Sequence, residues 1–291
     1  MKTATQLALL AASLSTAAPA LAQPYLQGHY IPGVEGILAA TLPPAGIYLR
    51  DYNYVYWANR FNMPDGSQAP GAFNAVVYAN VPRVVWMTGQ KVLGADFGMD
   101  ALVPLVYKNI EGLGNHFSAG DVFFEPILLS WHKQKFDAAI GYAFYAPTAP
   151  LGPLDAGQGF WTQMITFGGT WYADAKKTWS ISALNRYEFN HVQRNTGIRP
   201  GQVYTLEYGI AKALTPALKF GAAGYYQTQT TLDSGGSYVY TSRDSAAAIG
   251  PEITYDFPGI MLFTSLRYAR EFCANDRPQG NVVTLTITKR F

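Results

Sequence analysis

The sequence has 291 residues and carries few charges for its length. Charged residues make up 14% and hydrophobic residues 49% of the chain, with 20 tyrosines and 28 glycines, whereas an average soluble domain has about 25% charged residues. The formal net charge of +2 is too small to indicate a nucleic acid or another strongly charged partner. A single cysteine, Cys273, excludes an internal disulfide.

Residues 1–22 have the layout of a secretory signal peptide. Lys2 precedes the short apolar stretch Leu7 to Leu14, and Ala20-Leu21-Ala22 predicts cleavage before Gln23. The stretch is too short for a membrane anchor, and no later run approaches the roughly 18–20 apolar residues of a membrane helix. The mature chain is therefore either a soluble exported protein or a membrane β-barrel, and its composition favours the barrel.

Residues 23–45 do not alternate and are rich in glycine and proline. A barrel of about twelve strands has a lumen too wide for wall side chains alone to fill. This segment is therefore expected either to fold into the lumen as a plug or to form a periplasmic tail.

From residue 46 to Phe291 the chain divides into about twelve strand-like runs, an even number, as bacterial single-chain barrels have. The runs are 46–61, 72–87, 92–107, 117–131, 136–147, 160–172, 179–192, 202–211, 218–231, 245–255, 260–272 and 282–291. Tight turns at 88–91, 132–135, 173–177, 213–216 and 256–259 alternate with longer connections at 62–71, 108–116, 148–159, 193–201, 232–243 and 273–280. Short periplasmic turns and longer extracellular loops are typical of an outer-membrane antiparallel β-barrel.

Several runs have a polar face that we expect to line the lumen. Arginine or lysine on the lipid side costs about 2–4 kcal/mol near the bilayer midplane, so isolated charges in these runs should point inward. The candidates for a lumen or substrate path are Arg186, Glu188, Glu207, Tyr225, Gln227, Gln229, Glu252 and Arg267. The alternative for each, favoured for the charged residues, is that it only stabilises the barrel interior through hydrogen bonds and ion pairs.

The last run ends in a terminal aromatic residue preceded by apolar residues at alternate positions. The outward residues expected there are Val283, Leu285, Ile287 and Phe291, with Lys289 as a departure at the membrane edge. This pattern resembles the signal that the bacterial barrel-assembly machinery recognises. A soluble β-sandwich could end in such a strand, but the other runs disfavour it.

Motifs along nearly the whole mature chain resemble one family, the "MetA-pathway of phenol degradation" proteins. They are the Gly28 to Ala45 stretch, Val92-Leu93-Gly94, Gly120-Asp121 followed by Pro126 and Trp131-His132, Tyr145-Ala146-Pro147-Thr148, Tyr187-Glu188-Phe189-Asn190, Gly224-Tyr225-Tyr226-Gln227 and Ile249-Gly250-Pro251-Glu252. Ala149, where the family tends to have glycine, and Ser118-Ala119 are departures.

The resemblance implies an outer-membrane protein that passes small hydrophobic or aromatic solutes, with outer-membrane lipid and lipopolysaccharide around it. It implies no catalytic residues and no cofactor, and the scattered histidines have no metal-ligand spacing. An enzymatic alternative is an outer-membrane lipid hydrolase using His116 and Ser118, which lie two residues apart on one strand face. A third alternative is a structural barrel without transport activity.

Overall fold

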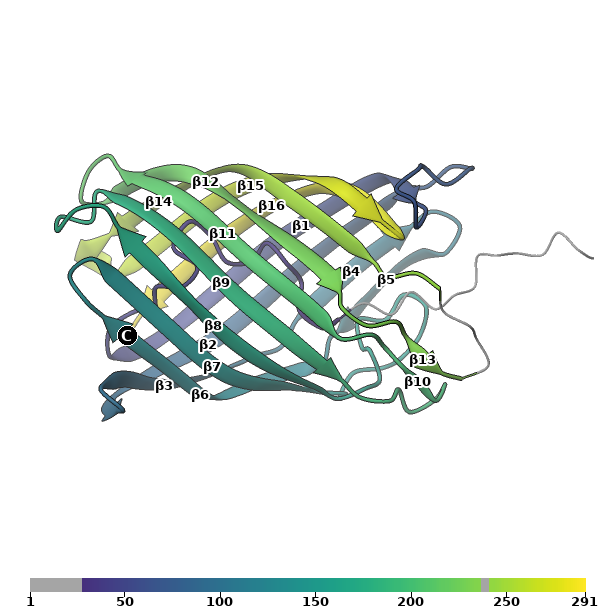
Figure 1. Cartoon of the computed structure of the whole chain (residues 1–291), viewed down its shortest axis with the longest axis horizontal. Coiled ribbons are helices and arrows are strands. Elements are labelled where there is room, and N and C mark those ends of the chain that lie inside the picture. Colours follow the sequence, from purple (N-terminus) through teal and green to yellow (C-terminus); the bar gives the residue numbers. More distant parts are fainter. Residues whose placement is uncertain (1–27, 237–240) are drawn as a thin grey trace, which may run out of the picture.

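The computed structural model describes residues 28–236 and 241–291, which form a closed antiparallel β-barrel with tilted strands (Figure 1). The predicted signal peptide, residues 1–22, lies outside the described residues. No described helix is long and apolar enough to cross a membrane.

The barrel wall consists of β1 (Gly46–Asn62), β2 (Ala75–Val92), β3 (Ala95–Leu102), β4 (Leu105–Ile110), β5 (Gly114–Ala119), β6 (Val122–His132), β7 (Phe136–Ala146), β8 (Thr162–Tyr172), β9 (Trp179–Asn190), β11 (Val203–Ala213), β12 (Leu218–Gln229), β14 (Ser245–Phe257), β15 (Leu262–Asn275) and β16 (Arg277–Arg290). A short pair, β10 (Ile198–Arg199) and β13 (Ser234–Gly235), lies outside it, and the 3-10 turn η1 (Pro258–Ile260) joins β14 to β15. β1 pairs with both β2 and β16, which closes the barrel.

Two wall strands are interrupted, so fourteen assigned strands make twelve barrel strands. β3 and β4 both pair with β2, and β5 and β6 pair with β4 and β3, respectively. Pro104 lies in the first gap and has no N–H for a ladder bond, while Gly120 and Asp121 form the second gap. The prediction of an outer-membrane barrel of about twelve strands is confirmed.

The two barrel ends differ in their connections. Short turns lie at the end that carries the C-terminus (Figure 1), and the backbone N–H of Phe291 donates to the carbonyl of Ile47 there at 2.9 Å. By the usual rule this end is periplasmic. Two expected extracellular loops are shorter than predicted, because the strands continue beyond the apolar band. Residues 111–113 alone join β4 to β5, and Asp276 alone joins β15 to β16 with a φ of 53°.

Alternation along each strand separates a lumenal face from a lipid-facing one. On β9, Ser180, Ser182 and Leu184 are buried, whereas Trp179 and Ile181 are about half exposed. Period-two alternation places every second side chain inside, and the exposed apolar side chains of this strand belong to the outer surface.

Residues 28–45 run inside the barrel as an irregular chain that leads into β1 (Figure 1). Tyr30, Glu35, Ile37, Ala39 and Ala40 of this lumenal segment are buried. An irregular backbone can lie at membrane depth only where its N–H and C=O groups find partners inside the protein. The wall must therefore supply those partners.

Candidate functional site: the barrel lumen

Three wall glutamates accept hydrogen bonds from backbone N–H groups of the lumenal segment. Glu188 Oε1 accepts from residues 29 and 30 at 2.8 and 3.0 Å. Glu207 Oε1 accepts from residues 33 and 35 at 2.9 and 3.0 Å, and Glu252 Oε2 accepts from Ile37 at 3.0 Å. Buried main-chain N–H groups need a hydrogen-bond acceptor, so β9, β11 and β14 hold the main chain of the segment through these glutamates.

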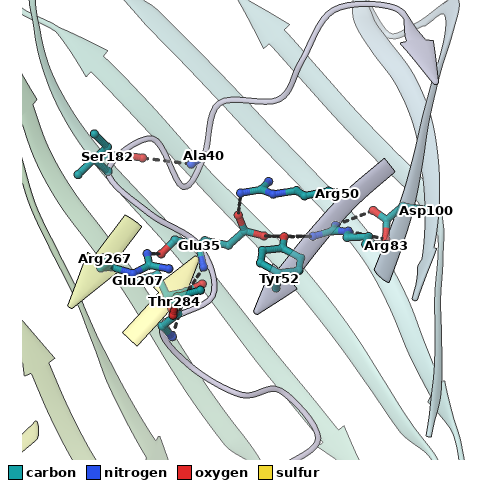
Figure 2. A network of polar contacts seen from close by, with 12 residues as sticks. Glu35, Ala40, Arg50, Tyr52, Arg83, Asp100, Ser182, Glu207, Arg267 and Thr284 are labelled. Atoms are coloured by element: carbon teal, nitrogen blue, oxygen red, sulfur yellow. Dashed lines mark hydrogen bonds and ion pairs between the residues drawn. The ribbon is translucent and has the colours of Figure 1, made fainter. Parts of the chain in front are cut away.

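Other wall side chains donate to the carbonyl oxygens of the same segment. Gln227 Nε2 donates to the carbonyl of residue 30 at 3.0 Å, and Thr284 Oγ1 donates to that of residue 33 at 3.3 Å. Arg267 donates to the carbonyl of Glu35 (Figure 2). These bonds give the irregular backbone partners that a sheet or helix would otherwise provide.

The side chain of Glu35 lies at the centre of a buried charge network (Figure 2). Its carboxylate is 3.0 Å from Arg50, 3.1 Å from Arg83 and 3.5 Å from Arg186, and the hydroxyl of Tyr52 donates to it at 3.1 Å. A buried carboxylate is stable only when it is paired and hydrogen-bonded. Glu35 therefore ties the segment to β1, β2 and β9 through its side chain.

The arginines of this network have further partners on the wall. Arg83 bonds Asp100 through two nitrogens, at 2.9 and 2.6 Å, and lies 3.3 Å from Glu125. Arg186 Nη1 donates to Glu207 at 2.6 Å and to the hydroxyl of Tyr30 at 2.8 Å. Arg83 and Arg186 thus keep a wall carboxylate even without Glu35, whereas the ion pair of Arg50 is with Glu35 itself.

His29 joins the segment to an extracellular connection. Its Nε2 lies 3.0 Å from Asp121 and its Nδ1 lies 2.8 Å from the hydroxyl of Thr162. Asp121, in the second wall gap, also accepts the backbone N–H groups of Ala149 and Gln158 at 2.9 and 2.8 Å. One carboxylate therefore holds both the lumenal segment and the connection between β7 and β8.

Glycine allows the segment to pass close to the wall at two points. A Cβ on Gly209 would lie 2.7 Å from the Cα of Ile37. Gly33 has a φ of +86°, which L side chains rarely adopt, and a Cβ there would lie 2.9 Å from the ring of Tyr225. The segment and the wall are thus packed in van der Waals contact.

A small cavity of about 60 Å³ remains between the segment and the wall. Its lining includes the charged Arg83, Glu125 and Arg186, the polar groups of His29, Tyr30 and Tyr52, and a larger number of apolar side chains. The apolar and aromatic residues include Ile31, Val34, Val81, Leu102, Phe123, Tyr145 and Met164. An engineered apolar cavity that binds benzene is about 150 Å³, so this space is too small for an aromatic ring in the conformation described.

All eight lumen candidates from the sequence are buried in the barrel. Arg186, Glu188, Glu207, Gln227, Glu252 and Arg267 contact the segment as described. The hydroxyl of Tyr225 donates to Glu271 at 2.7 Å. Gln229 makes no hydrogen bond with residues 28–45 of the segment. It bonds Asp233 and the backbone N–H of Asp244, both in the extracellular connection between β12 and β14. Burial raises the pKa of Asp233 there, although N–H groups of Gly201 and Gln229 oppose the shift.

Sequence reasoning missed the charged residues of the first strands. Arg83, Asp100 and Glu125 are buried in the lumen, Arg50 is partly buried there, and all four share the network with Glu35. Isolated charges within apolar runs, such as Arg83 between Val81 and Val85, were the available signal.

His116 and Ser118 each contact a different residue of the connection between β7 and β8. Ser118 Oγ accepts the backbone N–H of Ala156 at 2.8 Å, and His116 Nε2 lies 3.1 Å from Asp155. No hydrogen bond joins His116 to Ser118 within the described residues, and a serine nucleophile needs its base within that reach. The described residues also contain no cluster of three or more side chains that could hold a metal ion.

The C-terminal strand presents its apolar face outward. Leu285 and Ile287 are exposed on β16 while Thr284 and Thr286 are buried, Val283 is half-buried, and Phe291 is 70% exposed.

The fold and the lumen together define an outer-membrane β-barrel whose interior is occupied by its own N-terminal segment. Residues 58–287 match the family described as "MetA-pathway of phenol degradation", and the chain belongs to this family. A search of curated proteins finds no match.

Solved structures share the architecture at low sequence identity. The COG4313 outer membrane channel from Pseudomonas putida F1 is 12% identical, with a TM-score of 0.75, over 87% of this chain and 97% of that one. The NanC porin is 8% identical, with a TM-score of 0.49, over 84% and 100%. The CymD monoaromatic hydrocarbon channel is 10% identical, with a TM-score of 0.44, over 86% and 89%. At these identities only the first comparison carries weight, and it concerns the fold alone.

Proposed function

We propose that the protein is an outer-membrane channel for small hydrophobic or aromatic molecules and that residues 28–45 act as its plug. The observation that carries the proposal is the set of wall glutamates bonded to the main chain of this segment. Family membership supports the solute class. The function needs no nucleophile, because the solute crosses unchanged.

The small volume of the cavity beside the segment supports a closed lumen. A space of about 60 Å³ beside the segment holds no aromatic ring. The segment must therefore shift before a solute of this class can pass. Conduction requires binding that is favourable yet escapable, and the apolar lining with three charged side chains offers weak sites of that kind once the segment moves.

Single-channel conductance of the full chain in planar bilayers tests the plug. Replacing Glu207 by glutamine removes the charge that holds residues 33 and 35, and we expect the open probability to rise at least tenfold. The matched control is Asp256→Asn, because Asp256 is an acid at the periplasmic end that pairs with Lys219 at 2.9 Å. Equal conductance in wild type and Glu207→Gln would refute the plug.

Solute uptake tests the channel. Asymmetric vesicles bearing lipopolysaccharide should admit a radiolabelled aromatic hydrocarbon faster with the protein than without it, and a small sugar should not enter faster. No acceleration of either solute would instead favour a structural barrel.

The apolar outward face of β16 supports a further part of the proposal, recognition by the barrel-assembly machinery. Deletion of Phe291 should lower the amount of folded barrel in the outer membrane. A matched Phe136→Ala variant, with an exposed aromatic residue outside β16, should not.

A further inference from the structure

A polar cluster lies on the outer face of the barrel at β1 and β2. Tyr52 and Tyr54 are buried in the lumen, so Asp51 and Asn53, which alternate with them, face outward. Arg83 is likewise buried on β2. By the same alternation, Tyr78 and Asn80 face outward beside Asp51 and Asn53. We call Asp51, Asn53, Tyr78 and Asn80 the outer polar cluster.

The members of the outer polar cluster bond one another. Nδ2 of Asn53 and Nδ2 of Asn80 donate to the two carboxyl oxygens of Asp51 at 2.9 and 2.8 Å. The hydroxyl of Tyr78 donates to Oδ1 of Asn53 at 2.9 Å. A carboxylate offers about four acceptor sites, so Asp51 retains unused capacity. Within the described residues, one N–H of Asn53 and the Oδ1 of Asn80 also make no hydrogen bond.

The cluster lies at the middle of the apolar band. On the β1–β2 ladder Ile47 pairs with Trp86 near the periplasmic end, and Trp57 pairs with Val76 near the extracellular end. Both tryptophans are exposed outward, at 47% and 37%, as girdle residues at the membrane interfaces are. The rungs that join Asp51 to Pro82 and Asn53 to Asn80 lie midway between them.

Outward charges elsewhere on the barrel lie at the interfaces. Lys212 Nζ lies 5.3 Å from the ring centroid of Trp179 near the periplasmic turns. Arg270 pairs with Asn281, and Asn281 pairs with Trp57, so Arg270 lies at the extracellular girdle. Long side chains at such positions reach water. Asp51 is short and at mid-depth, so it cannot.

A polar group in the hydrocarbon region is unfavourable unless another polar group meets it. A partner for the outer polar cluster must therefore lie within the membrane and supply both donors and acceptors. A second copy of the same cluster does this, because each copy has an unused N–H and unused oxygens. A two-fold axis through the cluster would bring the unused N–H of Asn53 in one copy toward the unused oxygens of the other.

The surroundings of the cluster suit close contact between two barrels. Many of the neighbouring outward residues on β1, β2 and β16 are aliphatic, namely Leu49, Val55, Val84, Leu285 and Ile287, and the rings of Tyr78 and Tyr107 lie on the extracellular side of the cluster. Such a surface can pack against its own copy around a polar centre, as polar residues do between membrane helices. We propose that the outer face of β1 and β2 is a homodimer interface centred on Asp51 and Asn53.

Cysteine cross-linking of the full chain in lipid vesicles tests the interface. In a Cys273→Ser background, Val55→Cys places a thiol on β1 beside Asn53. The control, Ile181→Cys, places one on β9, which the strand order sets on the opposite side of the barrel. Mild oxidation should give covalent dimers of Val55→Cys at least tenfold more often than of Ile181→Cys. Equal yields would overturn the proposal.

A second measurement links the dimer to the polar groups. Adding Asp51→Leu and Asn53→Leu to Val55→Cys should lower the dimer yield at least tenfold, while heat-modified gel mobility still reports a folded barrel. An unchanged yield would overturn the role of the cluster. If the added substitutions prevent folding, the comparison of Val55→Cys with Ile181→Cys still decides. A monomeric wild type whose solute uptake falls on Asp51→Leu would also overturn the dimer and assign the cluster to a solute path.

Discussion

The lumenal segment is held differently by the two sides of the barrel. On the side formed by β9 to β16, Glu188, Glu207 and Glu252 contact main-chain N–H groups, and Gln227 contacts a carbonyl oxygen. Arg186 on β9 also contacts the side chains of Glu35 and Tyr30. On the side formed by β1 to β8, the contacts go mainly to side chains, apart from the bond that the hydroxyl of Tyr48 donates to the carbonyl of Pro44. Arg50 and Arg83 bind Glu35, Asp121 binds His29, and Asp137 accepts the hydroxyl of Thr41 at 3.1 Å.

The two kinds of contact have different consequences. Main-chain contacts determine how tightly the lumenal segment is held, and side-chain contacts determine its register against the wall. Every residue of a chain except proline offers an N–H, so main-chain contacts hold the segment whatever its side chains are. Side-chain contacts form only when one particular residue stands opposite its partner. The β9 to β16 side should therefore supply most of the holding free energy, and the β1 to β8 side should fix which residue lies where.

The largest effect should come from Glu207, on the main-chain side. Glu207→Ala removes the acceptor for two N–H groups and leaves Arg186 without its nearest carboxylate, and breaking a buried ion pair costs about 3–5 kcal/mol. Urea unfolding from lipid vesicles, followed by tryptophan fluorescence, measures the loss. The double variant with Arg186→Met should recover part of it, and no recovery would contradict the pairing.

Glu35, on the side-chain side, should have a smaller effect. Glu35→Gln weakens its bonds to Arg50 and Arg83, but Arg83 keeps Asp100 and Glu125. Hydrogen bonds to charged groups contribute about 1.5–3 kcal/mol, and the same unfolding assay should show a loss in that range. A loss larger than that of Glu207→Ala would reverse the ranking of the two sides.

A larger side chain at Gly209 tests the packing of the segment against the wall, because it removes no hydrogen bond. Gly209→Ala places a Cβ against the backbone of Ile37, and overpacking costs about 1–3 kcal/mol. Limited proteolysis should cut residues 28–45 faster in this variant. Gly259→Ala is the control, because no atom lies within 4 Å of a Cβ there.

The smallest effect should come from His29. His29→Ala removes its bonds to Asp121 and Thr162, each worth about 0.5–1.5 kcal/mol if neutral. Asp121 keeps the N–H groups of Ala149 and Gln158, so the extracellular connection should stay in place. Hydrogen exchange should therefore rise at residues 29–31 and remain unchanged at residues 149–158.

Strand count and the lumenal position of the glutamates could be predicted from the sequence, because β9 to β16 alternate cleanly. Glu188, Glu207 and Glu252 stand in otherwise apolar or small-residue contexts, and only the inside of the barrel accommodates their charge. The same rule of inward charges fails at Asp51, which faces outward within a strand whose two faces both carry aromatic residues.

The path of the segment and the faces of the early strands could not be predicted. Inward positions shift by one residue between Ser118 and Phe123, and again between Glu125 and Leu128, where the pairing registers are interrupted. A one-residue shift exchanges the two faces. An alternation pattern that is extended across a shift therefore assigns the residues beyond it to the wrong face of the barrel wall. The position of Glu35 depends on three strands distant in sequence, which no local pattern specifies.

The covalent joining of residues 28–45 to β1 at Gly46 has a consequence for reversibility. A segment that leaves the lumen stays tethered to the rim, so its return is intramolecular and independent of protein concentration. Short tethers give effective concentrations on the order of millimolar. A free peptide of the same sequence would need to reach a similar concentration to compete for the lumen.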